Sequence, residues 1–111
     1  MVNEVVLIGS DALGSPDEKL GRILMTSFLR LLSQRDELPK YVILWNGGVK
    51  LAARDTETSG FLKSLEDSGV NLILCRTCVE YFGVEGELGA GVIDGMVRIQ
   101  EILANHHVLT V

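Results

Sequence analysis

The segment VNLILCRTC (residues 70–78) indicates how this chain folds. Its first five residues form a short, nearly continuous apolar run that follows Gly69. Runs of this kind are typical of strands buried on both faces of a sheet. VVLIG (residues 5–9) and YVILW (residues 41–45) have the same character. All three segments are therefore predicted to be strands of a single sheet.

Apolar residues at helical spacing follow each of these strands. One long helix is expected between the loop SDALGSP (residues 10–16) and Pro39. Ser15 or Asp17 is expected to cap its first turn. Its predicted buried face consists of six apolar residues: Leu20, Ile23, Leu24, Phe28, Leu31 and Leu32. A shorter helix is expected to bury Phe61, Leu62 and Leu65 and to end at Gly69.

The last third of the chain is predicted to add smaller elements. A short helix begins near Cys78, and a short strand lies around residues 91–93. Asp94 is expected to cap a final helix that buries Met96, Ile99 and Leu103. HHVLTV (residues 106–111) forms the last strand, in which at least one of the two histidines faces solvent or a subunit boundary.

Strands followed by helices predict a mostly parallel sheet covered on both faces. Residues 1–111 are thus expected to form a single α/β domain with about five strands. In such sheets, functional residues gather beyond the carboxyl ends of the strands. That rule brings together three loops, at residues 10–16, 46–52 and 75–78.

Composition narrows the classes of partner. The net charge of −5 disfavours nucleic acid and anionic membranes, both of which need a basic surface. No apolar run approaches the roughly 20 residues that cross a bilayer. The first ten residues lack the features of a signal peptide. We therefore expect a cytoplasmic protein with reduced thiols.

Cys75 and Cys78 are the only cysteines, and they lie at the predicted functional edge. The start of a helix and the charge of Arg76 are both expected to favour a thiolate. Two buried structural thiols are the alternative. A zinc site is disfavoured because it needs four ligands, and only a folded-back His106 and His107 could complete one.

Two further classes fit the sequence less well. A C-x-x-C motif beside a βαβ pattern is typical of thioredoxin-like oxidoreductases. Here, however, the motif follows a third strand, and no proline follows Cys78 to supply the cis-proline. GSDALG (residues 9–14) matches neither the dinucleotide-binding nor the Walker glycine pattern, so a nucleotide site is disfavoured.

The order of motifs resembles the DsrE/DsrF-like proteins, most closely the C-terminal domain of YedF proteins, which are linked to selenium metabolism. The matching segments span residues 9–32, 38–52, 64–84 and 91–103. The most specific pieces are LGRILM, NGGVKLA and CRTC followed by an aromatic residue and Gly83. The chain departs from the family at Arg76, usually Gly, and at Gly95, usually Asn.

This resemblance implies a three-layer α/β/α sandwich with a five-stranded parallel sheet. It also implies homo- or hetero-oligomers, commonly dimers, trimers or hexamers, with a homo-oligomer expected here. The chain is expected either to act as a stand-alone domain or to work with a separate TusA-like sulfur-transfer partner. The cysteine at the position of Cys75 carries sulfur as a persulfide in the family, and no cofactor or metal is required. Cys78 belongs to a motif variant found in some members.

Two functions follow from the residues and the resemblance together. In the first, the protein is a sulfur or selenium carrier. Cys75 attacks a donor persulfide, and Cys78 releases the sulfur by closing a disulfide. The predicted pocket around the pair has six members: Arg76, Thr77, Asn46, Gly47, Gly48 and Met96. In the second, the protein is a non-catalytic oligomeric binding module with structural cysteines.

Overall fold

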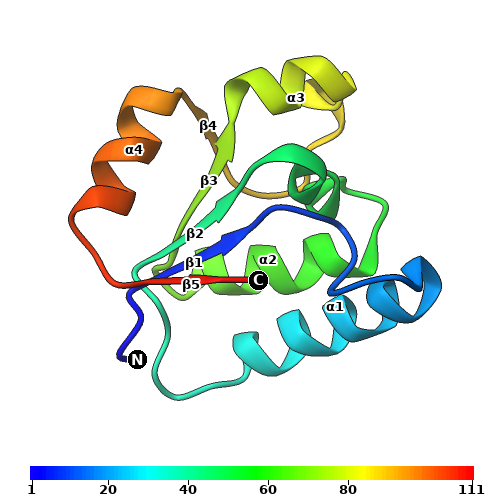
Figure 1. The fold of residues 1–111 in the computed structure, drawn as a ribbon, viewed down its shortest axis with the longest axis horizontal. Coiled ribbons are helices and arrows are strands. Elements are labelled where there is room, and N and C mark those ends of the chain that lie inside the picture. The colour runs from blue at the N-terminus through cyan, green and yellow to red at the C-terminus, as the bar shows by residue number, and fades with distance from the viewer.

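Five parallel strands form the centre of the molecule, and helices cover both faces of the sheet (Figure 1). This computed structural model describes residues 1–111. The strand order is β4-β3-β2-β1-β5. The strands are β1 (Val5–Ile8), β2 (Tyr41–Leu44), β3 (Asn71–Cys75), β4 (Val92–Asp94) and β5 (Val108–Thr110). The predicted three-layer α/β/α sandwich is confirmed.

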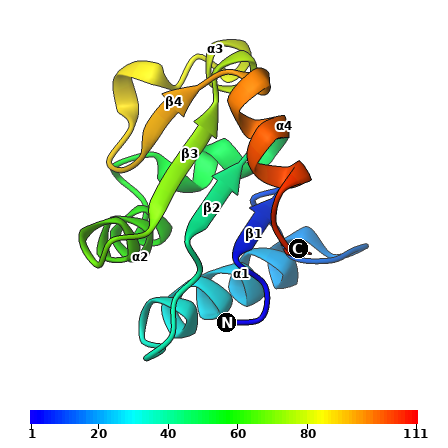
Figure 2. The ribbon, with the colours of Figure 1, turned by 90° about the vertical axis from the view of Figure 1, so that its left-hand side faces the viewer.

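The helices are distributed unevenly over the sheet. They are α1 (Glu18–Ser33), α2 (Glu57–Asp67), α3 (Arg76–Phe82), α4 (Met96–Ala104) and two 3₁₀-helices, η1 (Asn46–Ala52) and η2 (Glu85–Glu87). Figure 2 shows α4 on one side of the strands and α2 on the other, with α3 above the strand ends. One face is therefore covered by two long helices and the other by one short helix.

Side chains alternate between the two faces of the sheet along each strand, so the hydrophobic core has two parts. In β1, Val6 and Ile8 face α1 and α2, whereas Val5 and Leu7 face α4. This is the two-residue period of an extended chain. The core under α1 and α2 contains 18 buried residues, and the core under α4 contains 7. Cys75 belongs to the smaller core.

The register of the strands places the predicted functional loops at one edge of the sheet. Ile8 pairs with Leu44, and Cys75, the last residue of β3, pairs with Asp94. The segments that follow β1, β2 and β3 therefore leave the sheet at the same end. Residues 46–52, expected to be a loop, form η1 instead, which keeps this segment compact above the sheet.

The predicted buried face of α1 is wrong for four of its six residues. Leu20, Ile23, Leu24 and Leu31 are 46–57% exposed. The predicted Leu32 is buried and Phe28 is partly buried against the core, and the helix also buries Gly21, Met25 and Leu29. The helix is apolar around more than half of its circumference, so residue spacing alone does not choose the face. On the face that is buried, Gly21 permits close packing, because a Cβ there would lie 2.9 Å from the Cβ of Ala12.

Two predictions at helix starts have different outcomes. Asp17 caps α1 as expected, since its side chain accepts the backbone N–H of Leu20 at 2.9 Å. Asp94 does not cap α4: it is the last residue of β4, and Gly95 is the N-cap. The Asp94 carboxylate accepts the N–H of Gly95 at 2.7 Å instead.

Within α4, Ile99 and Ile102 are the buried residues, while Met96 is 50% exposed. This differs from the predicted set, in which Met96 was buried. None of the helices has the length and apolar character needed to cross a membrane.

Candidate functional site

The two cysteines lie at the junction between β3 and α3. Cys75 ends β3 and is the N-cap of α3, with φ −64° and ψ 121°. Cys78 is the third residue of that helix. The Cys75 side chain makes no capping hydrogen bond to the first turn of the helix. The two residues belong to one helical turn, and Cys78 packs against the core cluster that contains Cys75.

Burial distinguishes the two thiols. Cys75 is 1% exposed and packs in the core under α4 with Ile73, Ile99 and Ile102. Cys78 is partly buried and borders a hollow on the surface. The expectation that Cys75 is a reachable sulfur is therefore not met in the isolated chain. The reason is its place at the end of a strand, beneath α4.

The hollow beside Cys78 has a volume of about 510 Å³. Its lining residues come from η1 and α3: Asn46, Thr77, Cys78, Tyr81 and Phe82. The rings of Tyr81 and Phe82 meet edge to face, with centroids 5.2 Å apart. Lys50 Nζ lies 4.4 Å from the centroid of the Phe82 ring. The hollow thus joins a sulfur to aromatic walls, with one cation at its margin.

Asn46 connects η1 to the sulfur. Its backbone N–H donates to Cys78 Sγ at 3.0 Å. Asn46 has a φ of +51°, in the left-handed region that asparagine adopts more readily than most residues. Its side-chain oxygen accepts the N–H of Gly47 at 2.8 Å. The strand-to-helix turn after β2 is therefore shaped so that an N–H points at the sulfur.

The pKa of the Cys78 thiol is raised above its ordinary value. Burial is the largest cause, and the neighbouring Cys75 thiol adds to it, while the hydrogen bond from Asn46 acts in the opposite direction. The sequence-based expectation of a thiolate-favouring environment is thus wrong for Cys78. Arg76 is exposed and forms no ion pair, and α3 has only seven residues.

The structure gathers only part of the predicted pocket. Asn46, Thr77 and Cys78 line the hollow, but Gly47, Gly48, Arg76 and Met96 do not. Gly48 is buried against the backbone of Ile8, where a Cβ would overlap the carbonyl oxygen. Its role is close packing between η1 and β1.

Sequence reasoning did not place Tyr81 or Phe82 in the site. The sequence does contain a signal for them, since Tyr81 and Phe82 follow Cys78 by three and four residues. Residues at these distances share one helix face. Tyr81 is 83% exposed, which is unusual for so large a side chain.

The histidines lie at the opposite end of the sheet from the cysteines, because they immediately precede β5. His106 Nδ1 lies 2.7 Å from the carbonyl oxygen of Ile102, and His107 is exposed. No group of three or more His, Cys, Asp or Glu side chains comes together as metal ligands do.

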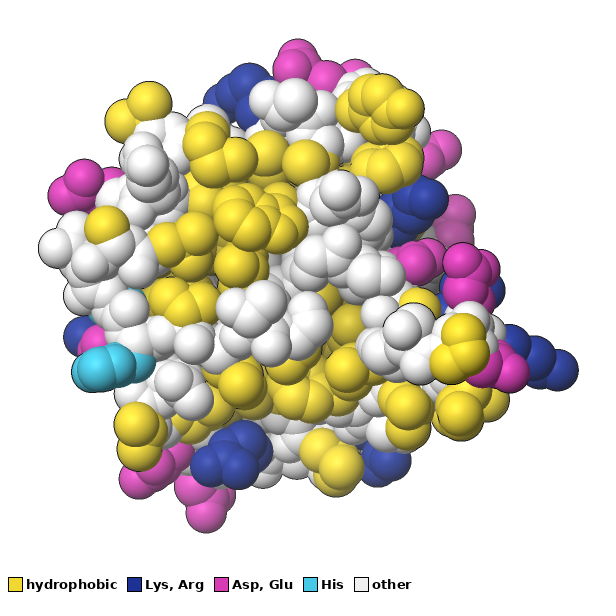
Figure 3. Space-filling model, in the orientation of Figure 1, with side chains coloured by type: hydrophobic (Ala, Val, Ile, Leu, Met, Phe, Trp, Pro, Cys, Tyr) yellow, Lys and Arg dark blue, Asp and Glu magenta, His cyan; other side chains and the backbone are white.

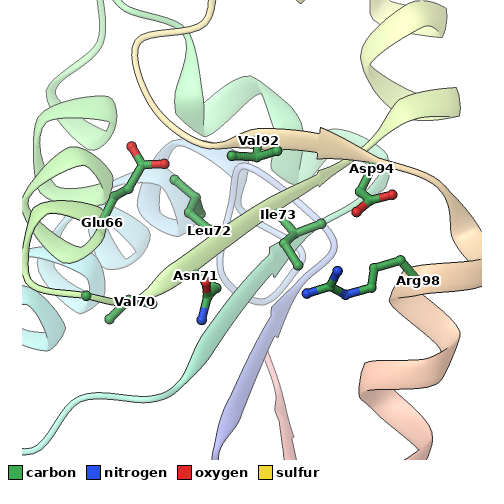
Figure 4. Close-up of a pocket in the computed structure, with 9 residues that line it drawn as sticks. Glu66, Val70, Asn71, Leu72, Ile73, Val92, Asp94 and Arg98 are labelled. Carbon is green, nitrogen blue, oxygen red and sulfur yellow. The ribbon is translucent and has the colours of Figure 1, made fainter.

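A second hollow, of about 350 Å³, lies along the edge of the sheet beside β3 and β4 (Figure 4). The side chains of Asp94 and Arg98 lie at one end of it, with Arg98 directed toward Ile73. At the other end, the Glu66 carboxylate accepts the N–H of Gly91 at 3.2 and 3.3 Å. This hollow contains no nucleophile, so the cysteine junction is the stronger candidate.

Comparison with solved structures identifies the class of fold. The ychN protein from E. coli superposes with a TM-score of 0.71 at 20% identity, covering 98% of this chain and 99% of that one. MTH1491 from Methanobacterium thermoautotrophicum, a protein of unknown function, gives 0.65 at 24% identity, with 96% of each chain covered. BT1422 from Bacteroides thetaiotaomicron, also of unknown function, gives 0.69 at 20% identity, covering 98% and 95%.

These likenesses extend over nearly the whole chain and show its fold, the DsrE-like fold that the sequence resemblance predicts. No family model matches the sequence, and no curated protein matches it significantly. The narrower resemblance to YedF proteins stays a prediction.

Proposed function

We propose that this protein is a sulfur carrier that takes up sulfur as a persulfide on Cys78. The observation that supports this most strongly is the junction of β3 and α3. One sulfur there borders an open hollow and accepts an N–H bond at 3.0 Å. The second sulfur, on Cys75, lies in the core cluster against which Cys78 packs.

The transfer itself requires only thiol chemistry. The Cys78 thiolate attacks the outer sulfur of a donor persulfide, R–S–SH. A new S–S bond forms on Cys78, the donor S–S bond breaks, and the donor leaves as a thiolate that takes up the Cys78 proton. The Asn46 N–H favours the attacking thiolate, while the raised pKa keeps the resting group as a thiol. This combination limits reaction with other electrophiles.

The assignment to Cys78 differs from the resemblance, which implies Cys75 as the carrier. A donor enzyme must bring its own persulfide into contact with the accepting sulfur. Cys75, at 1% exposure, offers no such contact in the chain alone. Because Cys78 lines the hollow, we assign the first transfer to it. The same chemistry applies to selenium, to which the resemblance to YedF proteins points.

Oligomer formation is part of the proposal. Four apolar side chains of α1 are exposed: Leu20, Ile23, Leu24 and Leu31. A contiguous apolar surface of this kind marks an interaction site. Figure 3 shows a further gathering of hydrophobic side chains over the middle of the molecule, beside α4. We propose that copies of this chain, and a TusA-like donor or acceptor, cover such surfaces.

A non-catalytic binding module is the second candidate. The burial of Cys75 and the raised pKa of Cys78 both favour it, because both features suit structural thiols. The aromatic hollow would then hold a small ligand or a side chain of a partner.

Incubation with a cysteine desulfurase and cysteine separates the two functions. A carrier is expected to take sulfur from the desulfurase. Its intact mass then shows either one added sulfur atom or, where the persulfide has been discharged as hydrosulfide, the loss of two hydrogen atoms, and a reductant is expected to reverse both changes. Omission of the desulfurase is the control for sulfur acquired from solution. If the mass does not change while the same desulfurase loads an established carrier, the binding module is the correct description.

A further inference from the structure

We infer that Cys75 is a resolving thiol, which converts the Cys78 persulfide into a disulfide and expels the sulfur as hydrosulfide. This inference rests on the proposed function and names its product. The roles differ from those expected from the sequence, because the exposed cysteine receives sulfur and the buried one discharges it. The protein then acts as a persulfide reductase as well as a carrier.

The arrangement of the two cysteines supports this order of events. Cys75 and Cys78 are the N-cap and the third residue of α3, which is the C-x-x-C spacing of redox-active cysteine pairs. Cys78 packs against the core cluster that contains Cys75. The neighbouring Cys75 thiol is also one cause of the raised pKa of Cys78. A sulfur bound to Cys78 is therefore within reach of Cys75.

Burial restricts what Cys75 can attack. At 1% exposure, and surrounded by aliphatic side chains such as Ile73 and Ile99, it meets no electrophile from solvent. The only sulfur beside it belongs to Cys78. Cys75 is thereby protected from unwanted oxidation and reserved for an electrophile delivered by its neighbour.

The reaction balances without a metal or an organic cofactor. In its ionised form, Cys78–S–S⁻, the persulfide takes up the proton of the Cys75 thiol on its terminal sulfur, and the Cys75 thiolate attacks Cys78 Sγ. The Cys75–Cys78 bond forms, the bond between Sγ and the terminal sulfur breaks, and HS⁻ leaves. Two thiols are oxidised to a disulfide, while the sulfane sulfur is reduced to sulfide. An external dithiol then reduces the disulfide and is itself oxidised.

Access for that dithiol comes from the hollow. Because Cys78 borders it, an incoming thiolate can attack the Cys78 side of the disulfide and free Cys75 first. Tyr81 and Phe82 form the aromatic walls of the hollow. Because Tyr81 is 83% exposed, these walls leave the Cys78 side of the disulfide open to solvent.

The test uses reduced full-length chain, glutathione persulfide as the donor in less than equimolar amount, and no reductant. Wild-type protein is expected to release about one hydrosulfide for each persulfide consumed, and to lose two hydrogen atoms in its intact mass. Cys75→Ala is expected to retain one added sulfur atom and to release hydrosulfide at least about tenfold more slowly. A dithiol added afterwards should restore a second round in the wild type.

Three outcomes are decisive. Hydrosulfide release by Cys75→Ala at the wild-type rate overturns the resolving role while leaving the carrier function intact. A wild-type persulfide that accumulates without a disulfide does the same. Failure of both proteins to consume the donor overturns the proposed function itself. Because alanine lacks the buried sulfur atom, Cys75→Ala is expected to unfold at a somewhat lower temperature than the wild type. A single cooperative thermal transition verifies that the variant is folded.

Discussion

Replacement of Cys78 by serine is expected to reduce sulfur loading by a desulfurase to the level measured without the protein. A hydroxyl is not nucleophilic at neutral pH, and the other thiol lies 1% exposed in the core. The hydroxyl still accepts the N–H of Asn46, so the hollow keeps its shape. Intact-mass measurement of the transferred sulfur gives the result directly.

Cys75→Ala is the matched control for this experiment. It removes the other thiol of the same turn, yet it is expected to gain sulfur at about the wild-type rate. Full loading of Cys78→Ser combined with no loading of Cys75→Ala would contradict the assignment and return the carrier role to Cys75. The buried sulfur would then have to become accessible by movement of α4, which covers it together with Ile99 and Ile102.

Gly48→Ala is expected to cause the largest loss of stability of any single methyl addition near the site, about 2–3 kcal/mol in the free energy of unfolding. A Cβ at this position overlaps the carbonyl oxygen of Ile8 and lies 3.0 Å from its carbonyl carbon. These are backbone atoms at the end of a central strand, so neither can move aside cheaply. Urea unfolding followed by circular dichroism measures the change.

Gly47→Ala is the adjacent control. Its Cβ would meet only Ser10 Cα at 3.7 Å and Asp11 N at 3.8 Å, which are ordinary van der Waals distances. Neither Gly47 nor Gly48 has a positive φ, so backbone strain does not distinguish them. A change below about 1 kcal/mol is expected for Gly47→Ala. Equal losses for the two variants would show that the close packing of η1 on β1 is not what requires Gly48.

The strands could be predicted from the sequence because each is a short apolar run with a turn on either side. β1, β2 and β3 all lie within one residue of their predicted bounds. The predicted strand ends also indicated which loops lie together at the edge of the sheet. The hydrogen bond from the Asn46 N–H to Cys78 Sγ joins two of these loops. The apolar pattern and the turn residues that flank it are properties of the local sequence, and this local signal is sufficient to predict the three strands.

Helix orientation and side-chain access depend on contacts that are distant in sequence. On the buried face of α1, Gly21 packs closely against Ala12, a contact made only after the loop folds back. Likewise, the sequence predicts that both cysteines lie at the edge of the sheet, but it is the packing of α4 that shields Cys75, and not Cys78, from solvent. Its residues Ile99 and Ile102 come more than twenty positions later in the chain.

Short exposure of the native, reduced protein to iodoacetamide tests most directly whether Cys78 is the sulfur that reaches solvent. Trypsin cleaves after Arg76 and so places the two cysteines on different peptides. We expect modification on the Cys78 peptide alone. Its rate should keep increasing as the pH rises beyond the usual range for thiols, since burial raises the pKa of Cys78 and only the thiolate reacts. Modification of Cys75 before Cys78 would contradict the proposed roles of both residues.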